Sequence, residues 1–105
     1  MSTATVLDLD GTPALWPDQI TANLWDRLPD TLSEDARADA THLALARLAG
    51  QAAAVPGVRW WLPQERRLAL HPGHQPDTVV AALAGWVGDP PPGVLADAAA
   101  AAAAG

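Results

Sequence analysis

Proline and glycine interrupt this chain so often that only short elements can form. The sequence holds ten prolines and eight glycines in 105 residues. Breaks fall at Gly11, Pro29, Pro56, Pro72 and Gly88. Proline lacks the backbone N–H that a helix needs, and glycine favours turns. Each stretch between breaks is long enough for one helix or one hairpin, and the whole chain has material for one domain with a single core.

The hydrophobic residues predict a modest core. Alanine supplies 24 of them, whereas Leu, Ile, Val, Met and Trp together supply 28. We expect a core built mainly from Leu and Trp and anchored by Trp25, Trp60 and Trp86. Phe, Tyr, Cys and Lys are absent, and the bias toward Ala, Pro, Gly and Arg is typical of GC-rich codons, which favours a bacterial origin.

Charge and cysteine content exclude several classes of function. Six arginines against twelve Asp and Glu give a net charge of −6, which opposes wholesale binding to a phosphate backbone. Without cysteine the chain forms no disulfide, no thiolate zinc site and no cysteine nucleophile. No window is apolar over the roughly 18 residues of a membrane span, and the N-terminus lacks a signal-peptide pattern. We expect a cytoplasmic protein with neither a nucleic-acid nor a membrane partner.

The first half of the chain predicts one strand and two helices. Residues 3–9 place β-branched and aliphatic residues ahead of an Asp-Gly turn, which predicts a short strand. A helix over residues 17–28 follows, with proline in its first turn and apolar residues at helical spacing. Thr31 and Glu34 match a capping box, which predicts a longer helix over residues 31–49 that can extend to residue 54.

The second half predicts a β-hairpin and a third helix. Residues 58–62 and 67–71 have the composition of strands around a turn at residues 63–66. Residues 77–88 carry an apolar stripe at helical spacing. Residues 1–88 are therefore predicted to form an α+β domain in which this last helix packs on a small antiparallel sheet.

The C-terminal end differs in composition. Residues 89–93 are dominated by proline, which predicts an extended linker. Residues 94–105 are rich in alanine and lack large side chains with which to pack. A helix of this length is marginal alone in water, so we expect a frayed helix or a disordered tail.

Strict alternation along the hairpin assigns its two faces. If the two strands of the hairpin contribute to one core face, the loop between them must have an odd number of residues. That core face then groups Val58, Trp60 and Leu62 with Leu68 and Leu70. The opposite, polar face then carries Arg59, Trp61, Arg67, Ala69 and His71.

An exposed tryptophan between arginines is typical of protein interfaces. We therefore interpret the chain as a small acidic, non-catalytic module of the adaptor, regulatory or immunity-type accessory class that binds another protein. A homodimer is an open alternative. The predicted partner-binding residues are Arg59, Trp61, Arg66, Arg67 and His71.

One short motif points to a different chemistry. Residues 6–12, Val-Leu-Asp-Leu-Asp-Gly-Thr, resemble the first signature of the haloacid dehalogenase superfamily of phosphotransferases. The resemblance implies that Asp8 is the nucleophile that accepts a phosphoryl group and that Asp10 is the general acid and base. It also implies that Thr12 contacts the phosphate or the turn, and that Mg²⁺ is the cofactor that screens the carboxylate from the phosphate.

The rest of the sequence favours a structural role for this motif. That family folds as a doubly wound parallel sheet, which needs repeated strand and helix units. It also needs a Lys or Arg beside the phosphate and later acidic ligands, whereas this chain has no Lys and offers Asp89 as the nearest later carboxylate. Asp and Gly after a strand also form an Asx-type turn. We predict a non-catalytic chain without a cofactor and keep a Mg²⁺-dependent phosphatase-like activity centred on Asp8 and Asp10 as the alternative.

A histidine-containing loop gives an alternative metal site. His71, His74 and Asp77 have metal-ligand side chains at plausible spacing, and His42 offers another nitrogen, which suits zinc or nickel. Ordinary loops carry such residues without a metal, so we predict no metal site.

Two helices ahead of a hairpin also fit a winged helix, with residues 31–49 as the recognition helix and the turn at residues 63–66 as the wing tip. The exposed positions of that helix include Glu34, Asp35 and Asp39 alongside arginines. It therefore presents mixed charge to DNA, and DNA binding is the second alternative function.

Overall fold

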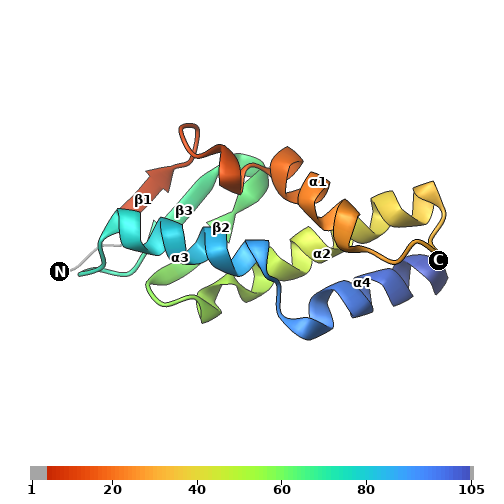
Figure 1. Ribbon diagram of the computed structural model, residues 1–105. Coiled ribbons are helices and arrows are strands. Elements are labelled where there is room, and N and C mark those ends of the chain that lie inside the picture. The colour runs from red at the N-terminus through yellow and green to blue at the C-terminus, as the bar shows by residue number, and fades with distance from the viewer. Residues whose placement is uncertain (1–4, 105) are drawn as a thin grey trace.

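The computed structural model describes residues 5–104, which form a three-stranded sheet and four helices (Figure 1). The predicted α+β architecture is confirmed, with an N-terminal strand, helices, a hairpin and a C-terminal helix in one domain. The strands are β1 (Thr5–Asp8), β2 (Val58–Leu62) and β3 (Arg67–Leu70). The helices are α1 (Pro17–Arg27), α2 (Glu34–Gln51), α3 (Pro76–Gly88) and α4 (Pro92–Ala104). Short 3-10 turns occur at η1 (Pro13–Leu15), η2 (Ala52–Ala54) and η3 (Pro63–Glu65).

The sheet is antiparallel and has the strand order β1-β3-β2. η3 joins β2 to β3 in the hairpin, and the N-terminal strand pairs with the other side of β3. In this register Ala69 of β3 lies between Val6 of β1 and Trp60 of β2. β3 is therefore the central strand, and its two neighbours determine what lies on each face.

A β-bulge in β2 changes the predicted faces of the hairpin. Arg59 is the extra residue between Val58 and Trp60, so the side-chain alternation slips by one position after it. Trp61 is 1% exposed and lies on the core face opposite Leu68. The prediction that Trp60 faces the core and Trp61 the open side is wrong, and so is the odd-numbered loop that it required. Leu62 pairs with Arg67 across a four-residue loop, which places Trp61 opposite Leu68, and the bulge allows Val58 to share the core face with Trp61.

The core lies between the helices and one face of the sheet. Its sheet residues are Val58, Trp61, Leu68 and Leu70, which all point to that face. Its main helical residues are Ile20, Leu24, Leu45, Leu48, Val79 and Leu83, which recur at spacings of three and four. This packing fixes the sheet from one side and leaves its other face outside the core.

The predicted tryptophan anchors lie largely outside this core. Trp86 is partly buried and packs against the core cluster. Trp25 is partly buried, and the guanidinium of Arg37 lies 5.3 Å from its ring centroid. Trp60 is on the other face of the sheet. The core is therefore anchored by Trp61 and aliphatic residues, and only Trp86 of the three predicted tryptophans packs against it.

Helix α2 is capped by Ser33 rather than by Thr31. The Ser33 hydroxyl accepts a hydrogen bond from the backbone N–H of Ala36 at 3.2 Å. The loop before the cap is held by Arg37, whose guanidinium donates to the Leu28 carbonyl at 2.9 Å. The predicted capping box is therefore wrong, because the anchored loop brings the serine and not the threonine to the cap position.

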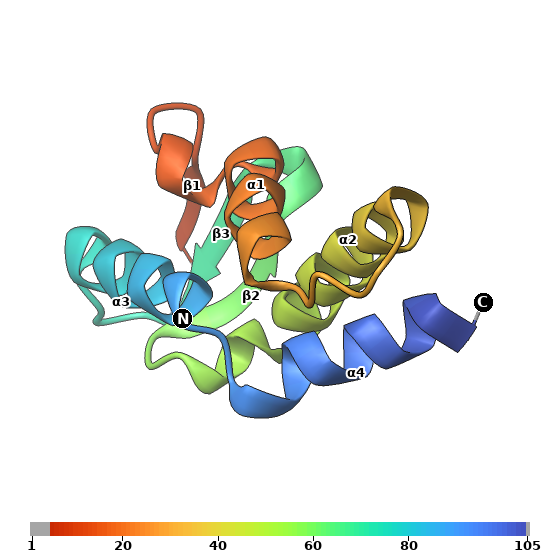
Figure 2. The same cartoon turned by 45° about the vertical axis from the view of Figure 1, so that its right-hand side comes forward.

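The alanine-rich tail forms α4, which runs beside α2 at the end of the molecule away from the sheet (Figures 1 and 2). Arg47 of α2 also lies 4.0 Å from the Asp97 carboxylate. Small side chains let the two helices approach closely, and Leu95 of α4 also packs against the core. Over residues 94–104, the described part of that range, this differs from the frayed or disordered tail that the sequence predicts. The buried residues of α4 are Val94, Ala98 and Ala99.

Candidate functional site

One face of the sheet is left largely open to solvent, and we call it the open face. Its side chains come from all three strands, and none of them belongs to the core cluster. Val6 is 52% exposed and Leu62 is 42% exposed, although both are large and apolar. Exposed apolar side chains grouped on one surface mark an interaction site more reliably than scattered ones. The residues of the open face are Val6, Asp8, Arg59, Trp60, Leu62, Arg67 and Ala69.

Trp60 is the largest side chain of the open face. It is partly buried and lies beside Ala69, which has Val6 on its other side. Ala69 is 0% exposed, which fits a methyl group shielded by two larger cross-strand neighbours. A tryptophan seated on a sheet in this way has little freedom to lose when a partner binds.

The open face carries the two arginines that form no ion pair within residues 5–104. Arg59 stands at the bulge next to Trp60, and Arg67 is the cross-strand neighbour of Leu62. Asp8 lies on the other side of Arg67. This face therefore has two cations and one carboxylate in a chain of net charge −6. The remaining arginines pair with carboxylates: Arg27 with Asp89, Arg37 with Asp30, Arg47 with Asp97 and Arg66 with Asp10.

The predicted interface residues are thus only partly brought together. Arg59 and Arg67 share the open face, as the sequence predicted. Trp61 does not, because the bulge turns it into the core, and Trp60 takes its place. Sequence reasoning missed Trp60 and also Leu62. Two adjacent tryptophans satisfy an alternating pattern in either register, so no signal in the strand itself identifies which one lies on the open face.

Arg66, another predicted interface residue, closes the hairpin instead. Its backbone is left-handed, with φ 54°, and its guanidinium lies 4.2 Å from the ring centroid of Trp16. The same guanidinium is 3.7 Å from the Asp10 carboxylate. The Trp16 indole N–H donates to the Leu9 carbonyl at 2.8 Å. These contacts tie the hairpin turn to the end of β1 and give Arg66 a structural role.

The Asp-x-Asp-Gly-Thr motif forms a turn at the end of β1. An Asp8 carboxylate oxygen accepts a hydrogen bond from the backbone N–H of Asp10 at 3.0 Å, which is the predicted Asx-type turn. Both side chains are exposed. Asp89, the later carboxylate, instead lies 3.8 Å from Arg27. The sheet is antiparallel, whereas the resembled family requires a parallel one, so the arrangement does not favour the phosphatase-like alternative.

The histidine-containing loop lies at the end of β3. His71 is exposed, and its backbone N–H donates to the Gly57 carbonyl at 2.9 Å. The His74 ring packs beside the same glycine. Among residues 5–104, no three His, Asp or Glu side chains are grouped so that they could hold a metal ion. The structure therefore gives the zinc or nickel alternative at His71, His74 and Asp77 no support.

A groove of about 530 Å³ separates α2 from the turn of the hairpin. Leu45, buried in the core, and the small side chains of Ala46 and Ala49 line its α2 side. Leu62 and Pro63 line the hairpin side. Because Leu62 also belongs to the open face, the groove and the open face form one continuous surface. His42 and Glu65 also line the groove.

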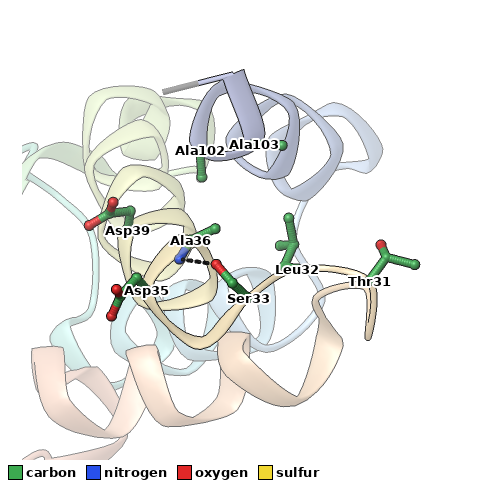
Figure 3. Close-up of a pocket in the computed structure, with 8 residues that line it drawn as sticks. All are labelled: Thr31, Leu32, Ser33, Asp35, Ala36, Asp39, Ala102 and Ala103. Carbon is green, nitrogen blue, oxygen red and sulfur yellow. Dashed lines mark hydrogen bonds between the residues drawn. The ribbon is translucent and has the colours of Figure 1, made fainter.

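A second hollow, of about 420 Å³, lies between the start of α2 and the end of α4 (Figure 3). Ser33 in this hollow is occupied in capping Ala36, as the dashed line in Figure 3 shows. Asp35 and Asp39 both project from the α2 side, and α4 contributes alanine methyl groups. This arrangement has no partner group for the carboxylates and carries no recognisable chemistry.

Helix α2 is poorly suited to DNA. α4 packs along one side of it, and its exposed residues include Glu34, Asp35 and Asp39. These carboxylates oppose approach to phosphates, so the winged-helix alternative is not favoured. None of the helices in the described part of the chain is both long enough and apolar enough to span a membrane.

Comparisons with protein families, with curated proteins and with solved structures gave no significant match to this chain. The features from which a function can be inferred are therefore the open face and the groove beside it.

Proposed function

We propose that this protein is a non-catalytic module that binds an acidic segment of another protein with the open face of its sheet. The observation that carries the proposal is that Trp60 shares the open face with Arg59 and Arg67, the two arginines that form no ion pair within residues 5–104. Tryptophan and arginine are the residues most often found at the energetic centre of protein interfaces.

Charge identifies the class of partner. Arg59 and Arg67 offer guanidinium groups that can bind carboxylates in a two-pronged geometry. A second copy of the chain would bring two like-charged faces together, which opposes self-association. A nucleic acid would meet repulsion from the rest of an acidic molecule. An acidic protein segment is also repelled by the rest of the molecule, but a short segment can confine its few carboxylates to the two arginines, whereas a nucleic acid carries a phosphate at every nucleotide.

The open face is suited to binding because its side chains are preorganised in the absence of a partner. The core on the opposite face fixes the strands, and the bulge at Arg59 holds that side chain next to Trp60. A preorganised aromatic residue avoids much of the entropy cost of binding. We therefore expect Trp60 to contribute about 2 kcal/mol or more to partner binding, or about 30-fold in affinity.

The proposal is tested by capture with the purified chain and with variants of it. The wild-type protein is used to recover partners from native bacterial lysate, and the bound segment is located by cross-linking and mass spectrometry. We expect a segment rich in Asp and Glu whose affinity falls as salt rises. Replacing its acidic residues by Asn and Gln should weaken binding, and so should Arg59→Ala or Arg67→Ala in this protein.

Matched variants separate the open face from the fold. Trp60→Ala should lose binding with little change in stability, whereas Arg27→Ala removes an arginine elsewhere on the surface and should bind normally. Full binding by Trp60→Ala, or a captured segment without acidic residues, would contradict the proposal.

A further inference from the structure

We infer that the groove between α2 and η3 is an anchor site for a large apolar side chain of the same acidic segment. This inference rests on the function proposed for the open face and names a second feature of the partner. The partner is then an acidic segment that carries one leucine-like or aromatic residue next to its carboxylates.

The lining of the groove favours an apolar occupant. Ala46 and Ala49 are small and leave room over α2, and Leu45 forms part of the buried surface beneath them. Leu62 forms part of the opposite wall and is 42% exposed. A volume of about 530 Å³ accommodates a large side chain together with part of the backbone that carries it.

Continuity with the open face connects this anchor to the arginines. Leu62 and Arg67 are cross-strand partners and lie on the same side of the sheet. Cross-strand side chains of this kind are about 5 Å apart at Cβ. A residue inserted beside Leu62 therefore brings its chain neighbours within reach of Arg67, which forms no ion pair within the described residues.

The charges around the groove also determine the direction in which the acidic segment binds. Glu65 lines the groove beyond Pro63, so it repels an acidic residue on that side. Arg67 and Arg59 attract acidic residues toward the sheet. The apolar residue should therefore stand at one end of the acidic run, with a neutral or basic residue on its other side. A segment with carboxylates on both sides of the anchor meets Glu65 and binds less well.

The inference is tested by ¹⁵N–¹H NMR with synthetic peptides and the full chain. One peptide carries a leucine followed by a run of glutamates, a second has Leu→Ala, and a third has Glu→Gln. The first peptide should shift the amide signals of Ala46, Ala49 and Leu62 together with those of Arg59 and Arg67. The Leu→Ala peptide should bind about tenfold more weakly, the loss expected when a leucine side chain is no longer buried, and should leave the signals of Ala46 and Ala49 unmoved.

Filling the groove gives an independent test. Ala46→Trp places a large side chain in the groove at an exposed position, and Ala81→Trp is the matched control on an exposed position of α3. Ala46→Trp should lower the affinity for the leucine peptide to that of the Leu→Ala peptide, and Ala81→Trp should bind like the wild type.

The two proposals fail in different ways. If the signals of Arg59 and Arg67 respond while those of Ala46 and Ala49 do not, or if Ala46→Trp binds the leucine peptide fully, the anchor is overturned and the open face stands. If the signals of Arg59 and Arg67 do not respond to any acidic peptide, the proposed function itself is contradicted and the anchor falls with it.

Discussion

The adjacent residues Trp60 and Trp61 should differ sharply in their effect on stability. Trp61 is 1% exposed within the core, whereas Trp60 lies outside the core cluster on the open face. Truncation of a buried tryptophan to alanine costs about 3–5 kcal/mol because it removes apolar contacts and leaves a cavity. Trp60→Ala removes a partly buried side chain outside the core cluster, whose cross-strand pairing is worth about 1 kcal/mol or less.

The difference is large against the stability of the whole domain. A domain of this size is stable by about 5–15 kcal/mol, so Trp61→Ala removes a third or more of a typical value. With an m-value of about 2 kcal/mol per M of urea, a loss of about 4 kcal/mol lowers the unfolding midpoint by about 2 M. Trp60→Ala should move the midpoint by about 0.5 M or less.

Urea unfolding followed by far-ultraviolet circular dichroism measures both midpoints. Far-ultraviolet detection is needed because the substitutions change tryptophan fluorescence themselves. Equal losses for the two variants, or a larger loss for Trp60→Ala, would refute the bulged register and the assignment of the open face with it.

Three further pairs of substitutions test other parts of the structure by the same measurement. Ser33→Ala should cost about 1 kcal/mol through loss of the α2 cap, whereas Thr31→Ala should cost almost nothing; the reverse order would restore the capping box at Thr31. Gly57→Ala should destabilise more than Gly73→Ala, since both have positive φ but only Gly57 would place a Cβ 2.7 Å from Val79 Cγ2; equal costs would show that backbone strain alone matters. Ala98→Leu should cost about 1–3 kcal/mol by overpacking the α2 and α4 contact, whereas the exposed Ala100→Leu should be neutral; a neutral Ala98→Leu would mean that α4 does not pack closely.

The elements of this fold could be predicted because local chemistry decides them. The Asp-Gly turn after β1, the proline at the start of α1 and the alternating hairpin each carry their own signal. The α+β architecture follows from that order of elements. The turn at Asp8 and Asp10 was also predictable, because the favoured local hydrogen bond of an aspartate needs nothing from the rest of the chain.

The errors arose where tertiary packing decides between local alternatives. Thr31 and Ser33 both suit a helix cap, and the loop contact of Arg37 selects the second. With the bulge at Arg59, Trp60 lies on the open face and Trp61 lies in the core. No residue in the strand predicts this bulge. The alanine-rich sequence of α4 predicts a helix that is marginal on its own. Packing against the small side chains of α2 stabilises it, and a local sequence pattern does not reveal this contact.

Only part of the candidate site can therefore be predicted from the sequence. The sequence pattern assigns Arg59 and Arg67 to the face on which the structure has them, since the alternation of β3 is regular and Arg59 stands at the bulge itself. The same pattern assigns Trp60 and Leu62 to the core, whereas both lie on the open face. The groove beside them could not be predicted, because it forms where α2 meets η3 and depends on the distance between two elements.

The Trp60 indole N–H signal gives the most direct test of the central claim. In a ¹⁵N–¹H titration with the acidic leucine peptide, this signal, assigned by its loss in Trp60→Phe, should move progressively while the indole signal of buried Trp61 stays in place. Added salt should reverse the change. Movement of the Trp61 signal alone, or a Trp60 signal that is unaffected while the peptide binds elsewhere, would contradict an acidic partner on the open face.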